Sequence, residues 1–133
     1  MVATDPVTSI WRHITIGNIR HGKFIRTLKD HGMIVDGWAA NTMKQSAFTV
    51  VRREERINLM VVSVRDLGFD NDTHYDAICQ RAKERGLELC PPEVGPQLRL
   101  QYLDQPLKER LFVAMKAIRS LYVGWWGIVK TGV

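Results

Sequence analysis

The segment from Ile57 to Val64 limits the possible folds of this chain more than any other. Only Asn58 and Ser63 interrupt its apolar residues, and most of those residues are β-branched. A short, nearly continuous apolar run of this kind is typical of a strand that is buried on both faces. We therefore predict a central strand here, and with it a sheet that other elements cover.

Further segments predict strands because they are rich in β-branched and aromatic residues, or because apolar and polar residues alternate in them. Between Leu98 and Tyr102, for example, Arg99 and Gln101 separate the apolar residues. We predict that this segment forms a hairpin with the strand that follows it. The additional predicted strands cover residues 10–16, 98–102, 111–118 and 122–129.

Helical spacing of apolar residues predicts helices over residues 23–31, after Asp36, and over residues 74–85. Asp36 can cap the second helix, while Gly32 and Gly86 stand where the first and third should end. This order of elements predicts one α+β domain over residues 1–133, with residues 1–9 loose. We expect a mostly antiparallel sheet of four or five strands, with two or three helices on one face.

The chain has 133 residues, enough for one domain with its own core. Its first ten residues lack the basic start of a signal peptide, and no apolar stretch is long enough to span a bilayer. Two cysteines fit a reducing compartment better than a disulfide framework. We therefore expect a cytoplasmic protein without a membrane partner.

Several stretches resemble one family of small bacterial proteins that has no established activity. They are Ala47-Phe48-Thr49-Val50, Asn58 to Val64, Leu67-Gly68-Phe69 and the long, specific stretch from Ala82 to Tyr102. The resemblance spans about residues 11–118, and residues 120–133 depart from the family pattern, which continues with further aromatic strands. It implies a bacterial origin and contributes no catalytic residues.

The segment from Cys90 to Tyr102 is the best candidate for a ligand site. Its three prolines would hold polar side chains in place, and a site benefits from such pre-ordering. An arginine beside a glutamine can hold a carboxylate or a phosphate. The alternative is a tight corner in which Arg99 pairs with Glu93 or lies in solvent. The candidate ligand-binding residues are Glu93, Gln97, Arg99, Gln101 and Tyr102.

A second candidate surface is basic. The net charge is +5, and basic residues recur at every third position near the first predicted helix. One helix face carrying them could contact phosphates, although an ordinary solvated face would look the same in sequence. The candidate nucleic-acid-binding residues are Arg20, Lys23, Arg26 and Lys29.

No pattern in the sequence predicts a metal or a cofactor. Cys90 would need a histidine nearby and a lowered thiol pKa to act as a nucleophile, and no cysteine-enzyme motif is present. The acidic residues between Asp66 and Asp76 lack the glycine and closing glutamate of a calcium loop. We predict turn and helix-start roles for these acids.

Three function classes remain open. Because no nucleophile-base or metal pattern appears, we expect a non-enzymatic protein-binding module, in which Trp125 or Trp126 on the last strand could meet a partner or a second copy. The alternatives are a nucleic-acid-binding accessory protein that uses the basic face, and a small enzyme with a cleft around Glu93, Arg99 and Tyr102.

Overall fold

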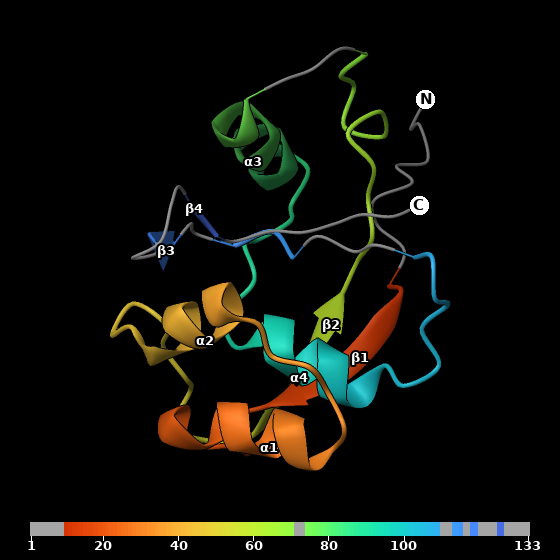
Figure 1. Ribbon diagram of the computed structural model, residues 1–133. Helices are drawn as coiled ribbons and strands as arrows, with labels where there is room; N and C mark the ends of the chain where they lie inside the picture. Colours follow the sequence, from red (N-terminus) through yellow and green to blue (C-terminus); the bar gives the residue numbers. More distant parts are fainter. Residues whose placement is uncertain (1–9, 71–73, 110–112, 116–117, 120–124, 127–133) are drawn as a thin grey trace.

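The computed structural model describes residues 10–70, 74–109, 113–115, 118–119 and 125–126. Within them it contains helices and short strands in mixed order (Figure 1). They are β1 (Arg12–Ile16), the short 3-10 helix η2 (His21–Lys23), α1 (Phe24–Asp30), α2 (Gly37–Lys44), β2 (Glu55–Leu59), α3 (Tyr75–Glu84), α4 (Val94–Gln101), β3 (Ile118–Arg119) and β4 (Trp125–Trp126).

The strands β1 and β2 form an antiparallel ribbon in which Ile14 lies opposite Ile57. Alternation along β1 buries Ile14 and Ile16 while His13 is exposed. This confirms the strand predicted over residues 10–16. The ribbon has two strands only in the described part of the chain, so β1 keeps one edge that no strand covers.

The predicted sheet of four or five strands is wrong. The described residues form two separate two-stranded sheets, β1–β2 and β3–β4. The apolar run does not form a central strand: β2 ends at Leu59, and Val61 and Val64 are exposed. The composition of the run is typical of a strand buried on both faces, but among the described residues only β1 pairs with it.

The predicted helices over residues 23–31 and after Asp36 are confirmed as α1 and α2. The Asp36 carboxylate accepts a hydrogen bond of 2.8 Å from the backbone N–H of Ala39, as a helix cap should. Gly32 has a φ of +79°, which lets the chain leave α1 in the left-handed conformation.

The predicted strand over residues 98–102 is wrong, and so is the hairpin built on it, because these residues belong to α4 and the turn that follows. Leu98 and Tyr102 are four residues apart, so they share a helix face with Val94, and all three are buried. Pro96 lies in the first turn of α4, where a missing N–H costs no helical hydrogen bond. The short alternation therefore concealed a helical repeat.

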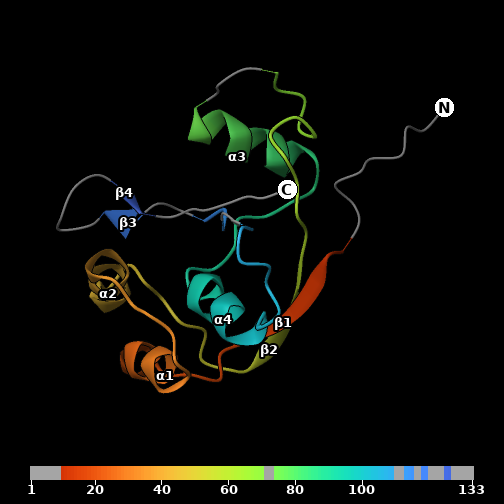
Figure 2. The ribbon, with the colours of Figure 1, turned by 45° about the vertical axis from the view of Figure 1, so that its right-hand side comes forward.

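The helix α4 lies between the β1–β2 ribbon on one side and α1 and α2 on the other (Figure 2). Two apolar clusters fill the spaces. The first joins β1, β2 and α4, and the second joins α1, α2 and the segment around Phe48. Their buried members are Ile14, Ile16, Leu59, Val94, Leu98 and Tyr102, and Phe24, Leu28, Met43, Phe48 and Met115, respectively.

The predicted helix over residues 74–85 is confirmed as α3, and Gly86 ends it with a φ of +83°. The backbone N–H of Leu87 returns to the Ala82 carbonyl, which closes the last turn. Figure 1 shows α3 above the other helices, at the end of a long connection from β2. No described helix is long and apolar enough to cross a membrane.

Two further predictions fall mainly outside the described residues. Within the predicted strand 111–118, residues 113–115 are not a strand, and Ile118 begins β3. Within the predicted strand 122–129, Trp125 and Trp126 form β4, which pairs with β3. The loose segment predicted for residues 1–9 also lies outside.

Candidate functional site

A polar stripe runs along α4 on the side that faces β1. Glu93, Gln97 and Gln101 are spaced by four residues, so their side chains point the same way. Glu93 is fully buried. One of its carboxyl oxygens accepts a 2.8 Å hydrogen bond from the N–H of Val51, and the other accepts a 3.0 Å bond from the N–H of Gly17. The side chain thus ties α4 to two distant loops.

Gln101 completes the edge of β1 that no strand covers. Its side-chain oxygen accepts from the N–H of Thr15 at 2.9 Å, and its amide donates to the Thr15 carbonyl at 2.7 Å. One amide side chain therefore satisfies the groups that a neighbouring strand would have paired. The Gln101 amide also donates to Gln97, whose own amide donates to Asn18.

Gly17 is required where the chain leaves β1. Its φ is +84°, and a Cβ placed there would lie 2.3 Å from the carbonyl oxygen of Arg53. The absent side chain lets the turn after β1 approach the loop before β2 closely. Both loops can then donate their backbone N–H groups to Glu93.

A shallow pocket of about 390 Å³ opens beside this stripe, between α4, the end of β1 and α1. Seven of its nine lining residues are polar, and Ile19 and Leu100 add apolar surface. Its lining residues come from distant parts of the chain. They are Thr15, Asn18, Ile19, Thr27, His31, Glu54, Gln97, Leu100 and Gln101.

The structure brings only part of the candidate ligand site together. Glu93, Gln97 and Gln101 share the stripe, whereas Arg99 is exposed on another side of α4 and donates to Gln105 at 3.4 Å. Tyr102 is buried against the Trp11 ring, and the Arg12 guanidinium lies 4.1 Å from the centre of its ring. Neither Arg99 nor Tyr102 lines the pocket.

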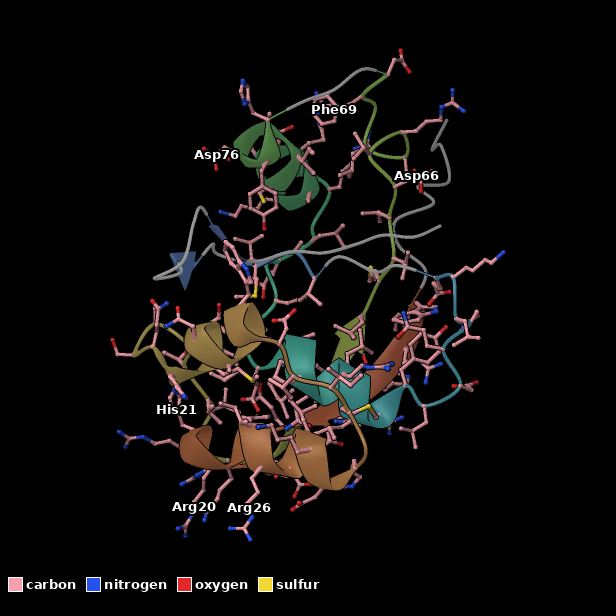
Figure 3. The ribbon with its side chains drawn as sticks, viewed as in Figure 1. Arg20, His21, Arg26, Asp66, Phe69 and Asp76 are labelled. Atoms are coloured by element: carbon pink, nitrogen blue, oxygen red, sulfur yellow. The ribbon has the colours of Figure 1, made fainter. Side chains whose placement is uncertain are left out.

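The four candidate nucleic-acid-binding residues lie together on the outer side of α1 and η2. Arg20, Lys23, Arg26 and Lys29 are all exposed. Figure 3 shows Arg20 and Arg26 extending away from the body of the protein on the same side, with His21 nearer α2. We call this set the basic face. No acid lies within salt-bridge distance of it in the described part of the chain.

The surroundings of Cys90 and of Asp66 indicate structural roles for these two residues. Burial raises the pKa of the Cys90 thiol to about 11, which opposes a nucleophilic role at neutral pH. The Asp66 carboxylate accepts from the N–H of Ser63 within a turn, and Figure 3 shows Asp66 and Asp76 far apart. Among the described residues, no three His, Cys, Asp or Glu side chains gather closely enough for a metal ion.

Sequence reasoning missed the pocket residues that lie outside α4. Asn18, Thr27, His31 and Glu54 carry no shared motif, and only the tertiary structure makes them neighbours. The polar stripe, in contrast, was visible in the sequence. Glu93, Gln97 and Gln101 recur at every fourth residue, which fits a helix face as well as the alternation from Leu98 to Tyr102 fits a strand.

Comparisons with known proteins give no relative. No protein-family model, curated protein or solved structure matches this chain. The resemblance to small bacterial proteins therefore stays a prediction, and the function must be argued from the geometry alone.

Proposed function

We propose that this chain is a nucleic-acid-binding accessory protein that contacts phosphates through its basic face. The observation that carries the proposal is that Arg20, Lys23, Arg26 and Lys29 are exposed together, with no acid paired to them among the described residues. Between Arg20 and Asp30 these four exposed bases face one exposed acid, Asp30, whereas most basic residues on ordinary surfaces are more evenly interspersed with acids. A local excess of one sign attracts a polymer of the other sign.

The spacing of the bases from the end of η2 along α1 suits a phosphate backbone. At about 100° per residue, Lys23, Arg26 and Lys29 fall within roughly one third of the helix circumference. They span about 9 Å along the axis, a distance over which a duplex presents several phosphates. Four contacts at most would give weak, salt-sensitive binding, as expected of an accessory protein and not of a high-affinity regulator.

Anisotropy titrations with random single-stranded and duplex nucleic acid at about 50 and about 200 mM salt test the proposal. We expect the logarithm of the affinity to fall with the logarithm of salt with a slope between about −3 and −4. The double variant Arg26→Gln/Lys29→Gln should bind several-fold more weakly, and the magnitude of the slope should fall by about two.

The matched control is Lys83→Gln/Lys108→Gln, which removes two exposed lysines that lie outside the basic face. It should retain the affinity and the slope. Equal weakening by both double variants would show that only net charge matters, and the basic face would then not be a binding surface.

A protein-interaction module is the second candidate, and exposed apolar residues favour it. Leu103 and Leu107 project from the turn after α4, with exposed fractions of 71% and 103%. Two exposed leucines so near each other are typical of a small contact surface. We place this candidate second because Ile34, the most exposed of the other large apolar residues that the structure describes, comes from the separate α1–α2 loop. Sedimentation at increasing concentration, for the native chain and for Leu103→Ser/Leu107→Ser, tests self-association.

A further inference from the structure

We propose that a second pocket, which lies between η2, α1 and α2, binds a phosphate group, and that a nucleic-acid strand on the basic face supplies this group. The source of the phosphate rests on the proposed function, which the pocket extends from α1 onto α2. The position of the pocket, the charges that line it and the open space at Gly22 favour this ligand.

The second pocket adjoins the basic face. Its volume is about 210 Å³, and its lining residues are His21, Gly22, Ile25, Met43 and Lys44. Each of Gly22 and Ile25 is followed directly by a residue of the basic face. In Figure 3, Arg20 and Arg26 extend away from the body, while His21 lies between them and α2. A strand that lies on the basic face therefore has this pocket within reach.

The side chains that line the second pocket favour an anion. Its two titratable residues, His21 and Lys44, are both basic, and none of the described acids lines it. Ile25 and Met43 add apolar surface, and charges of one sign beside walls of low dielectric constant concentrate the electrostatic field. The larger pocket beside α4 differs, because Glu54 lines it. A small, negatively charged phosphate group therefore suits the second pocket.

Neighbouring residues hold His21 at the wall of this pocket. Its Nε2 lies 3.3 Å from the carbonyl oxygen of Gln45, and its ring packs edge-on against the buried Phe48, with 5.6 Å between the ring centres. A group that is ordered before binding loses less entropy when the ligand arrives. Lys44 lies in the last turn of α2, where a base also stabilises the helix end, so a test has to separate these two roles.

Gly22 offers a way to close the second pocket without removing a charge. A Cβ at this position would meet no atom within 4 Å, and Gly22 is not among the glycines with a positive φ. Leucine can therefore replace it without backbone strain, and its side chain would occupy space that the phosphate needs. Alanine fills much less of that space and is the matched control.

Anisotropy titrations with random single-stranded nucleic acid at about 50 and about 200 mM salt test the proposal. Lys44→Gln and Gly22→Leu should each bind several-fold more weakly than the native chain. The magnitude of the salt slope should fall by about one in each, because each loses one phosphate contact. Gly22→Ala should keep both the affinity and the slope, and so should Lys83→Gln, which removes an exposed lysine outside the pocket.

Inorganic phosphate, added at constant ionic strength, separates the two sources of a phosphate group. The native chain should show saturable shifts of the Ile25 and Lys44 amide signals, and Gly22→Leu should show none. Such shifts without any loss of oligomer binding in Lys44→Gln and Gly22→Leu would uphold a site for free phosphate and overturn its link to nucleic acid. If the shifts appear and no oligomer binds at all, the proposed function is overturned and the phosphate site stands.

A further outcome would overturn the pocket and leave the basic face in place. In that case inorganic phosphate causes no shifts, and Lys44→Gln and Gly22→Leu bind the oligomer as the native chain does. Arg26→Gln/Lys29→Gln would still bind it more weakly. The failure of this inference and the failure of the proposed function are therefore distinguishable.

Discussion

Two regions of the molecule differ in the contacts that stabilise each of them internally. The body, made of β1, β2, α1, α2 and α4, has both apolar clusters and the polar stripe between α4 and β1. The α3 unit, residues 60–70 and 74–89, contains a helix without a single buried residue. Its apolar anchor is Leu67, and the Arg81 guanidinium donates to the Leu67 carbonyl at 2.7 Å.

The difference lies in how far apart in sequence the partners are. Glu93 and Gln101 form hydrogen bonds with residues more than forty positions away, so the body forms only when segments that are distant in the sequence come together. In the α3 unit, Arg81 contacts Leu67 and the Phe69 ring, both within fourteen positions. Regions with few buried contacts open at lower free energy than the core does. We therefore expect the α3 unit to open locally while the body unfolds as a whole.

The two regions meet along residues 113–115. The Tyr75 hydroxyl donates to the Met115 carbonyl and accepts from the Met115 N–H, and the N–H of Cys90 donates to the Ala114 carbonyl at 2.7 Å. Tyr75 opens α3, and Cys90 lies where the chain returns to the body. The hydrogen bonds of the junction therefore come from the Tyr75 hydroxyl and the Cys90 backbone, and the side chains of both residues titrate at alkaline pH.

The largest effect should come from Glu93→Gln in the body. The new amide would place N–H hydrogens against the N–H of Gly17 or of Val51, which leaves buried donors without an acceptor. We expect the free energy of unfolding to fall by about 3 kcal/mol, measured by urea denaturation. The exposed Glu88→Gln is the matched control and should change it by less than about 0.5 kcal/mol. Equal losses in both would mean that the stripe does not hold the body together.

Alkaline pH should act next, at the junction. Burial raises the pKa of Cys90 to about 11 and also raises that of Tyr75. Since the unfolded chain loses these protons at lower pH, the stabilisation is complete below about pH 8.5 and is lost as pH rises through 11. The share of Cys90 is on the order of 2 kcal/mol.

The contribution of Cys90 to this loss of stability is measured by urea midpoints at neutral pH and near pH 11, for the native chain and for Cys90→Ala. Lysines and other tyrosines titrate in both proteins, so the difference between the two isolates Cys90. A native chain that loses no more stability than Cys90→Ala over this interval would show that the thiol is not buried as described.

The smallest effect should come from Arg81→Ala in the α3 unit. It removes the hydrogen bond to Leu67 and the contact with Phe69, in which the guanidinium lies 4.7 Å from the ring centre. Global stability should change by about 1 kcal/mol or less, while amide hydrogens of α3 exchange roughly tenfold faster. Lys83→Ala, at an exposed site on the same helix, is the control. A large global loss with Arg81→Ala would show that the two regions unfold together.

Local patterns were enough to predict the helices outside α4. Asp36 caps α2, and Gly32 and Gly86 end α1 and α3, because capping and the left-handed conformation depend on neighbouring residues only. The strand before Gly17 was equally clear. The prediction failed at α4, where an alternation of period two over five residues fits a helical repeat just as well.

The sequence by itself determined where α1, α2 and α3 form and end and which side chains make the basic face, because each depends on residues a few positions apart. Only the tertiary structure decided that α4 covers the free edge of β1 through Gln101, and that Thr27, His31 and Glu54 share a pocket with it. The physical reason is that backbone groups left unpaired at a strand edge must find partners, and a single sequence does not say which distant side chain will supply them.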